Sequence, residues 1–256
     1  MSRGATIDLN ADVGEGCGFD GELIPLVSSV NIACGAHAGD EATMREALGL
    51  ALRSGVAIGA HPGFADRENF GRREIAMAPD EAGLLVVSQV ARLRNVAGGL
   101  GARVGHVKLH GALYNMASRD PELATAVVGA LSAYARKNGA LVLFALAGSV
   151  LQRLGKDAGL SVKGEAFADR SYRRDGSLVP RSEVGAVIED EAAAARQALR
   201  IAREGVVRTL DGADVRIDAA TLCIHGDKPG SVAFARRIRR ELAAAGITLA
   251  GDRTMA

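Results

Sequence analysis

The chain has 256 residues, of which 48% are hydrophobic, and its 31 Lys and Arg against 30 Asp and Glu give a formal net charge of +1. This composition excludes a disordered protein, and it offers no basic surface for a nucleic acid. No apolar run approaches the roughly 18 residues of a membrane-spanning helix, and the first residues lack the apolar core of a signal peptide. We therefore expect one domain over residues 1–256, located in the cytoplasm.

Short apolar runs alternate with longer helical patterns along the chain. The short runs predict strands, and apolar residues that recur every three to four positions predict helices. The Asp211-Gly212 pair is typical of a hairpin turn. In chain order, the predicted elements are a strand at 5–9, a strand within 26–35, a helix at 40–55, a strand at 56–60, a helix at 79–101, a strand at 104–109, a helix at 120–139, a strand at 140–146, a short helix near 149–157, a strand at 160–167, a helix at 189–205, a hairpin at 206–217, a strand at 221–225 and a helix at 230–246.

The alternation of strands and helices defines the expected α/β fold class. Strands that are apolar on both faces and separated by helices indicate a parallel sheet. About seven such strands in a chain of this length favour a closed (β/α) barrel, a distorted TIM-like form, over an open Rossmann sheet. A Rossmann domain would also need a glycine-rich pyrophosphate loop after its first strand, and Asp12 and Glu15 stand there instead.

Histidines gather at the ends of predicted strands. His37, His61, His110 and His225 each follow a strand, whereas His106 lies inside one and is interpreted as a structural residue. In a β/α barrel the carboxyl ends of all strands open onto one face, which holds the active site. Other polar residues at these strand ends are Asn10, Asp12, Glu15, Asp40, Arg67, Arg72, Lys108, Glu165, Asp169, Arg170 and Asp227. The sequence therefore predicts one polar site built from several chain segments.

The three cysteines, Cys17, Cys34 and Cys223, form no CxxC pair, so neither a disulfide framework nor a zinc ribbon is indicated. Cys34 is either a nucleophile beside His37 or a buried small apolar residue, and the frequent burial of cysteine favours the second. The chain also lacks a GxxxxGK[ST] loop. Any ATP would therefore be held by another kind of site or by another polypeptide.

Seven segments, in order between residue 7 and about residue 252, together resemble the LamB/YcsF family. They are IDLNADVGEG (7–16), NIACGAHAGD (31–40), GAHPGF (59–64) with FGRR (70–73), VKLHGALYN (107–115), EAFADRSY (165–172), LVPR (178–181) and CIHGD (223–227). The resemblance implies a barrel of the glycoside hydrolase/deacetylase type. It also implies ATP-dependent opening of 5-oxo-L-proline to L-glutamate, with ATP and Mg²⁺, in a complex with two further 5-oxoprolinase components, the B and C subunits. Lys108-Leu109-His110 departs from the Lys-Pro-His usual in the family, which loses a rigid kink but keeps both polar groups.

For such a reaction we expect Asp12 to act as the general base, with His61 or His110 as its acid–base partner. A carboxylate hydrogen-bonded to a histidine sets the tautomer of the ring and raises its basicity. Lys108 is expected to stabilise an oxyanion or phosphate oxygens. The full predicted catalytic set is Asp12, Glu15, His37, His61, Lys108 and His110.

The substrate carries one carboxylate, which a guanidinium binds well in a two-pronged grip. Arg67 or Arg170 is expected to supply that grip. The remaining predicted substrate contacts are Asn10, Asp40, Arg72, His225 and Asp227.

Two other functions stay open. In the first, Asp12, His37 and His61 bind a divalent metal, as an Asp and two His often do in deacetylase-type barrels, and the protein is an amide or ester hydrolase that needs no ATP. A metal assay on chelator-free protein separates this function from the ATP-driven one. In the second, the chain only binds the lactam or its activated form and hands it on. An assay of the B and C components alone tests that possibility.

Overall fold

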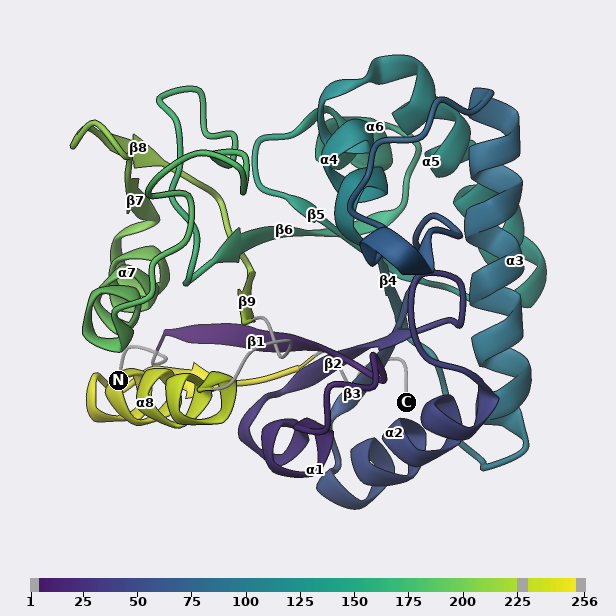
Figure 1. Ribbon diagram of the computed structural model, residues 1–256, viewed down its shortest axis with the longest axis horizontal. Coiled ribbons are helices and arrows are strands. Elements are labelled where there is room, and N and C mark those ends of the chain that lie inside the picture. The colour runs from purple at the N-terminus through teal and green to yellow at the C-terminus, as the bar shows by residue number, and fades with distance from the viewer. Residues whose placement is uncertain (1–4, 225–229, 252–256) are drawn as a thin grey trace.

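The computed structural model describes residues 5–224 and 230–251, and its centre is a closed barrel of seven parallel strands (Figure 1). Strand β1 pairs with β2 on one side and with β9 on the other, which closes the sheet. The short strand β10 pairs with the start of β1. In spatial order the barrel strands are β1 (Thr6–Val13), β2 (Ser29–Ala33), β3 (Ala57–His61), β4 (His106–Lys108), β5 (Val142–Leu146), β6 (Ser161–Phe167) and β9 (Thr221–Ile224), with β10 at Thr248–Leu249. The predicted α/β barrel of about seven strands is confirmed.

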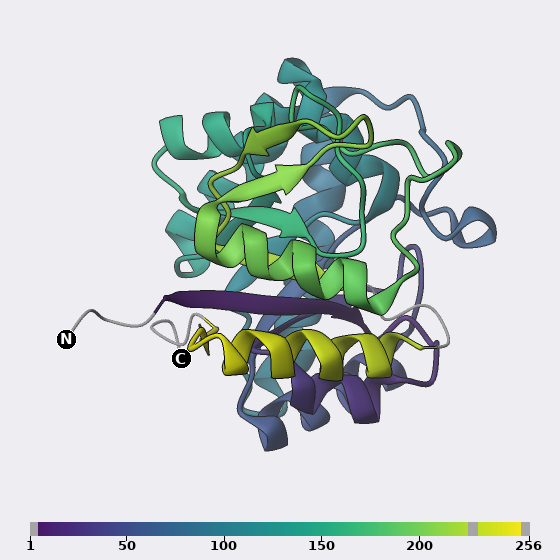
Figure 2. The same ribbon diagram turned by 90° about the vertical axis from the view of Figure 1, so that its left-hand side faces the viewer.

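Helices surround the barrel. In Figure 1, α3 to α6 lie on the right and at the top, α1 and α2 lie below, and α7 and α8 lie on the left. Figure 2 shows α7 and α8 side by side, with the β7–β8 hairpin beyond α7. The described helices are α1 (Asp20–Leu23), α2 (Glu41–Ser54), α3 (Pro79–Gly98), α4 (Gly111–Arg119), α5 (Pro121–Asn138), α6 (Val150–Asp157), α7 (Glu191–Glu204) and α8 (Ser231–Ala244), with 3₁₀ turns at Ile24–Leu26 and Arg67–Asn69. None of the helices in the described ranges has the length and apolar character needed to cross a membrane.

Most predicted elements lie where the periodicity placed them, including the hairpin β7 (Val206–Arg208) and β8 (Asp214–Arg216) around Gly212. Helix α4 was not predicted. It begins directly after His110, at Gly111, which has a left-handed φ of 55°. With no loop between strand end and helix, the sequence shows neither a cap nor a turn there. The same close join brings the first turn of α4 to the mouth of the barrel.

The inner and outer faces of the strands differ in polarity. In β1, Leu9, Ala11 and Val13 belong to the apolar core, and the alternating residues Asp8, Asn10 and Asp12 hydrogen-bond to neighbouring barrel strands. Buried polar residues in this inner network are Asp8, Asn10, Asp12, Ser29, Asn31, His61, His106, Lys108, Glu165 and Thr221. The strands are buried on both faces, as expected, but the expectation of apolar side chains on the inner face is wrong.

One glycine makes room for this polar interior. A Cβ atom on Gly59 of β3 would lie 2.1 Å from the His106 ring, so only glycine fits there. The His106 ring stacks on Phe144 at 4.2 Å between centroids and donates from Nε2 to Asn31 Oδ1 at 3.0 Å. His106 is 3% exposed. Its contacts therefore support the interpretation of His106 as a structural residue.

Candidate active site

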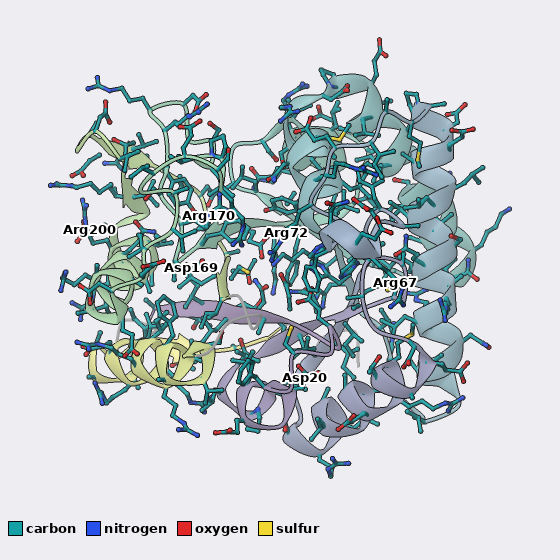
Figure 3. All side chains as sticks on the ribbon, viewed as in Figure 1. Asp20, Arg67, Arg72, Asp169, Arg170 and Arg200 are labelled. Atoms are coloured by element: carbon teal, nitrogen blue, oxygen red, sulfur yellow. The ribbon has the colours of Figure 1, made fainter. Side chains whose placement is uncertain are left out.

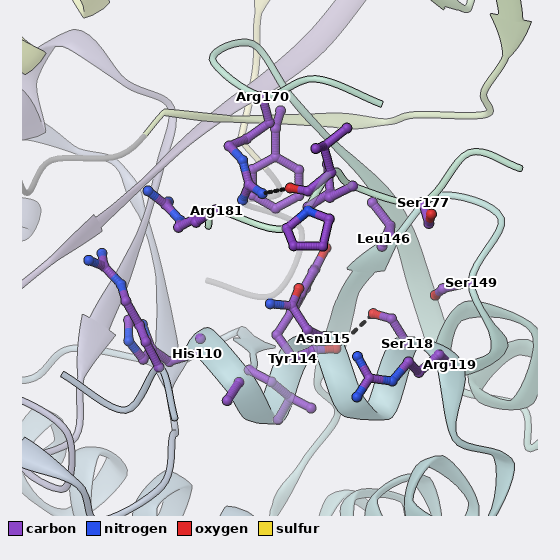
Figure 4. A pocket seen from close by; sticks show the side chains of 18 of the residues that line it. His110, Tyr114, Asn115, Ser118, Arg119, Leu146, Ser149, Arg170, Ser177 and Arg181 are labelled. Carbon is purple, nitrogen blue, oxygen red and sulfur yellow. Dashed lines mark hydrogen bonds between the residues drawn. The ribbon is translucent and has the colours of Figure 1, made fainter. Parts of the chain in front are cut away.

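The predicted catalytic residues meet at the carboxyl-terminal mouth of the barrel. Asp12 lies near the end of β1, His61 ends β3, Lys108 ends β4, and His110 follows it. All four line a cavity of about 750 Å³, which is closed on its other sides by α4 and by the segment 173–182 (Figure 4). Buried polar groups that converge on a concave pocket are the usual mark of an active site.

The Lys108 ammonium sits between two buried carboxylates. Its Nζ lies 2.9 Å from Asp12 Oδ1 and 3.0 Å from Glu165 Oε1, and 2.9 Å from Cys223 Sγ. Burial alone would lower the pKa of Lys108, but the charge of Asp12, followed by those of Cys223 and Glu165, holds it well above its usual value. Lys108 is therefore a permanent cation at the floor of the cavity.

Hydrogen bonds of two neighbouring histidines fix which ring nitrogens carry protons. His61 Nδ1 lies 2.8 Å from the Lys108 carbonyl oxygen, and His110 Nε2 lies 2.8 Å from the Phe70 carbonyl oxygen. Because a carbonyl only accepts, both nitrogens must donate. In neutral rings, His61 Nε2 and His110 Nδ1 then both present lone pairs, and they lie only 2.9 Å apart. Asp12 Oδ2 lies 3.2 Å from His61 Nε2. Three electron-pair donors thus converge, and they need a shared proton or a metal cation between them.

The shared proton has a preferred place. Burial, then the neighbouring His61 and His37, lowers the pKa of His110 well below its usual value. One proton held by the pair therefore resides on His61, beside the Asp12 carboxylate. Asp12 Oδ1 accepts from Asn31 and Lys108, which leaves Oδ2 to face this proton. Asp12, His61 and His110 together form a unit that can take up and release a proton.

A second cluster lies behind the first. His37 stacks on His110, with ring centroids 3.7 Å apart, and its Nε2 lies 3.3 Å from Glu15 Oε1. Glu15 Oε1 is also 3.5 Å from His110 Nδ1. Burial, followed by His61, lowers the pKa of His37 to about 3, so the ring is neutral. His37 Nδ1 is buried without a hydrogen-bond partner among the described residues. Neither Glu15 nor His37 lines the cavity, so both act on the site through His110.

Two groups in the described part of the chain have ligand atoms close enough to hold a metal ion: Asp12 with His61 and His110, and Glu15 with His37 and His110. In each group the atoms lie within 4.8 Å of one another. The predicted metal set of Asp12, His37 and His61 is not one of them. His37 turns its Nε2 toward Glu15, and His110 takes its place beside Asp12 and His61. The converging lone pairs of Asp12, His61 and His110 fit a divalent cation.

Not all predicted substrate contacts reach the cavity. Arg72 and Arg170 line it, and both lie toward the middle of the molecule in Figure 3. Exposed Arg67 donates to the backbone carbonyls of Gly35 and Gly39, so its guanidinium holds a loop and does not line the cavity.

Asp40 and Asn10 also lie away from the cavity lining. Asp40 is exposed and caps helix α2 by accepting from the Thr43 amide at 2.9 Å. Asn10 is buried beneath the site and donates to Glu165 Oε1 at 2.9 Å. The capping and network roles replace the substrate contacts expected for these two residues. His225 and Asp227 lie outside the described residues.

Three residues of the site were absent from the predicted catalytic and substrate-binding sets. Tyr114 of α4 lines the cavity and donates to Glu165 Oε2 at 2.8 Å; burial, then Glu165, raises its pKa well above the usual value. Glu165 and Cys223 both contact Lys108. The segment VKLHGALYN contained the signal for Tyr114. Cys34 is fully buried, and burial raises its pKa to about 12, which supports its interpretation as an apolar core residue.

Comparison with known proteins places this chain in a family. The model of the LamB/YcsF family matches residues 7–256. The A subunit of 5-oxoprolinase from Heliobacterium modesticaldum is 49% identical over 248 residues, which is 95% of this chain and 96% of that protein. The crystal structure of the lactam utilization protein from Thermus thermophilus is 45% identical, with a TM-score of 0.88 over 96% of this chain and 99% of that chain.

A more distant structure shares the fold alone. The T48 deacetylase with substrate is 14% identical, with a TM-score of 0.52 over 97% of this chain and 88% of that chain. The barrel is therefore of the deacetylase type, as the sequence resemblance implied. Together with its family match over residues 7–256, these relationships show that the chain belongs to the LamB/YcsF family.

Proposed function

We propose that this chain is the A component of an ATP-dependent 5-oxoprolinase and opens the ring of 5-oxo-L-proline on the way to L-glutamate. The names of the Heliobacterium and Thermus relatives support the proposal. A component named by a letter implies further components, and the complex would contain the B and C subunits. ATP with Mg²⁺ would be consumed in the cytoplasm, where ATP is made.

The observation that carries the proposal is an acid–base unit next to a fixed cation in one cavity. Asp12, His61 and His110 exchange a proton, and Lys108 stays charged 2.9 Å from Asp12. Hydrolysis of an amide needs a base for water, an acid for the departing nitrogen, and a cation for the negative charge that develops on oxygen. The site supplies all three.

ATP is needed because the lactam itself is unreactive: its amide is stabilised by resonance, and its five-membered ring has little strain. Transfer of the γ-phosphoryl group to the amide oxygen releases ADP and makes the ring carbon electrophilic. We assign this step to the partner components, because the chain has no phosphate loop.

Ring opening then takes place on this chain. Water adds to the ring carbon and gives a proton to the Asp12–His61–His110 unit. The carbon–nitrogen bond breaks, and the nitrogen takes a proton from the same unit, which leaves the acyl phosphate of glutamate. A second water converts the acyl phosphate to L-glutamate and inorganic phosphate. Lys108 stabilises negative charge on oxygen throughout.

The substrate carboxylate needs a cation of its own. Arg72 lines the cavity, and its guanidinium lies 4.9 Å from the ring centroid of Phe70, which contacts the edge of His110. An arginine in this position can grip a carboxylate in two-pronged fashion while the ring carbon faces Asp12. This assignment replaces Arg67, which faces the backbone of another loop.

A second candidate function rests on the converging lone pairs of Asp12, His61 and His110. A divalent ion bound there would polarise a carbonyl and lower the pKa of a bound water, so the protein would hydrolyse an amide or ester without ATP. Metal analysis of protein purified without chelators checks this candidate. One zinc, nickel or manganese per chain, together with ATP-independent amide hydrolysis, supports it over the ATP-driven reaction.

The proposed function is tested by omitting one component at a time. This chain and the purified B and C components are mixed in all combinations with 5-oxo-L-proline and ATP, and released glutamate is measured. We expect release only from the complete mixture. Glutamate release by the B and C components alone at the full rate would overturn the proposal and would leave this chain, at most, a binding role.

A further inference from the structure

The wall of the cavity carries more positive charge than the lactam itself requires. Six cationic side chains line it: Arg72, Lys108, Arg119, Arg170, Arg173 and Arg181. Three of these are neutralised, since Lys108 lies between Asp12 and Glu165, Arg119 pairs with Glu74, and Arg173 pairs with Glu183. Arg170 and Arg181 form no ion pair with any residue in ranges 5–224 and 230–251.

Arg170 is a buried guanidinium with free donors. It is 4% exposed. Its Nε donates to the Ala186 carbonyl at 3.2 Å, and Nη2 donates to the Val179 carbonyl at 2.5 Å. Both acceptors are uncharged backbone groups, and a guanidinium has five N–H donors in all. The two backbone bonds fix the orientation of the group and leave further donors for a ligand.

Arg181 faces the same space from the segment that covers the cavity. Figure 4 shows Arg170 and Arg181 near one another, with His110 and Tyr114 on the opposite side. Burial and then the charge of Arg181 lower the pKa of Arg170 to about 10, and the charge of Asp169 opposes them by a smaller amount. The two cations are therefore close enough to repel each other, and an anion bound between them would relieve the repulsion. Two guanidinium forks match the oxygens of a phosphoryl group in geometry and charge.

We infer that Arg170 and Arg181 bind the phosphoryl group of an O-phosphorylated lactam. This inference rests on the proposed function and adds the form of the substrate that the chain receives. The phosphoryl group stays on the substrate while the carbon–nitrogen bond breaks and leaves only at the end, as inorganic phosphate. A dianion must therefore be held through both hydrolytic steps, at a distance from the carboxylate bound by Arg72. The cavity, at about 750 Å³, has room for both ends of such a ligand.

The test measures binding of inorganic phosphate to the purified full-length chain, by equilibrium dialysis with radioactive phosphate at constant ionic strength. The variant is Arg181→Gln, which keeps polarity at a partly exposed position. Arg53→Gln is the matched control, because it removes one charge from an exposed arginine of α2 outside the cavity. Binding of unphosphorylated 5-oxo-L-proline is measured in parallel.

We expect Arg181→Gln to weaken phosphate binding about ten- to a hundredfold, as loss of a charge-assisted hydrogen bond predicts, and to change 5-oxo-L-proline binding less than about threefold. Arg53→Gln should bind both like the unmodified chain. Phosphate binding that is absent at millimolar concentration, or equal in the two variants, would overturn the inference. So would an equal loss of 5-oxo-L-proline binding in Arg181→Gln, because the arginines would then hold the carboxylate. No partner component or turnover is involved, so this result is independent of the omission test.

Discussion

At the scale of single residues, Lys108 links the structure of the barrel to its chemistry. It is 2% exposed, and the two carboxylates beside it, Asp12 and Glu165, are 7% and 0% exposed. A buried charge without a partner is costly, so the ammonium holds the network together as well as facing the cavity. Stability and activity at this position are therefore coupled.

Lys108→Met should lower the free energy of unfolding by about 3–5 kcal/mol, because it leaves Asp12 and Glu165 without their cation. Adding Glu165→Gln removes one of the unpaired charges and should restore part of this loss. Urea denaturation followed by circular dichroism measures both variants. Lys156→Met, at a half-exposed position, is the control and should change stability by less than about 0.5 kcal/mol. Equal losses for Lys108→Met and Lys156→Met would contradict the buried network.

His37 gives the stability a dependence on pH. Its pKa is about 3 in the folded chain and about 6.5 when unfolded, so only the unfolded state gains a proton as pH falls between these values. The stability contributed by the neutral ring is complete above about pH 6.5 and decreases below it by about 1.4 kcal/mol per pH unit.

Replacing the ring removes this dependence. Between about pH 6 and about pH 4, His37→Gln should lose about 2–3 kcal/mol less free energy of unfolding than the unmodified chain. Urea titrations at several pH values give the comparison. Parallel pH dependences for the two proteins would show that His37 is protonated in the folded chain.

At the scale of elements, β3 shows how the backbone makes space for polar groups. Gly59→Ala would place a methyl group 2.1 Å from the His106 ring, and overpacking of this kind costs about 1–3 kcal/mol or prevents folding. Thermal unfolding should show a clear decrease in the melting temperature. The double variant Gly59→Ala with His106→Ala should recover part of it.

A helical glycine provides the contrast. A Cβ atom on Gly129 in α5 meets nothing within 4 Å, so Gly129→Ala should raise stability by about 0.5–1 kcal/mol. If Gly59→Ala is as harmless as Gly129→Ala, the packing of His106 against β3 is wrong.

The elements also show what the sequence could predict. Strand ends carried the catalytic signal, since His61 and His110 follow apolar runs and a barrel brings such ends together. Asp40 and Arg67 occupy similar places in the chain, but their side chains cap a helix and bind backbone carbonyls. Which polar group at a strand end faces the cavity depends on side-chain direction, which periodicity does not encode.

At the scale of the whole molecule, the closed barrel follows from the alternation of strands and helices, and the polar interior does not. The partners of Lys108 come from β1, β6 and β9, which are far apart in the chain. Arg181 belongs to an irregular segment without helical or strand periodicity. Both depend on tertiary contacts, and only the resemblance to a family marked their segments.

The whole molecule presents one cavity with two kinds of charge, an acid–base unit at its floor and arginines on its wall. The account therefore divides the work of the complex: partner components activate the lactam, and this chain opens it. The central claim is that proton transfer by Asp12 and its histidines breaks the carbon–nitrogen bond.

The most direct test measures glutamate release from 5-oxo-L-proline and ATP by the complex assembled with Asp12→Asn. We predict a decrease of at least about a hundredfold, the usual contribution of a general base, with the variant still folded by circular dichroism and still bound to its partners. His61→Gln should give the same result if Asp12→Asn fails to fold. Release at the full rate by either folded variant would contradict the account.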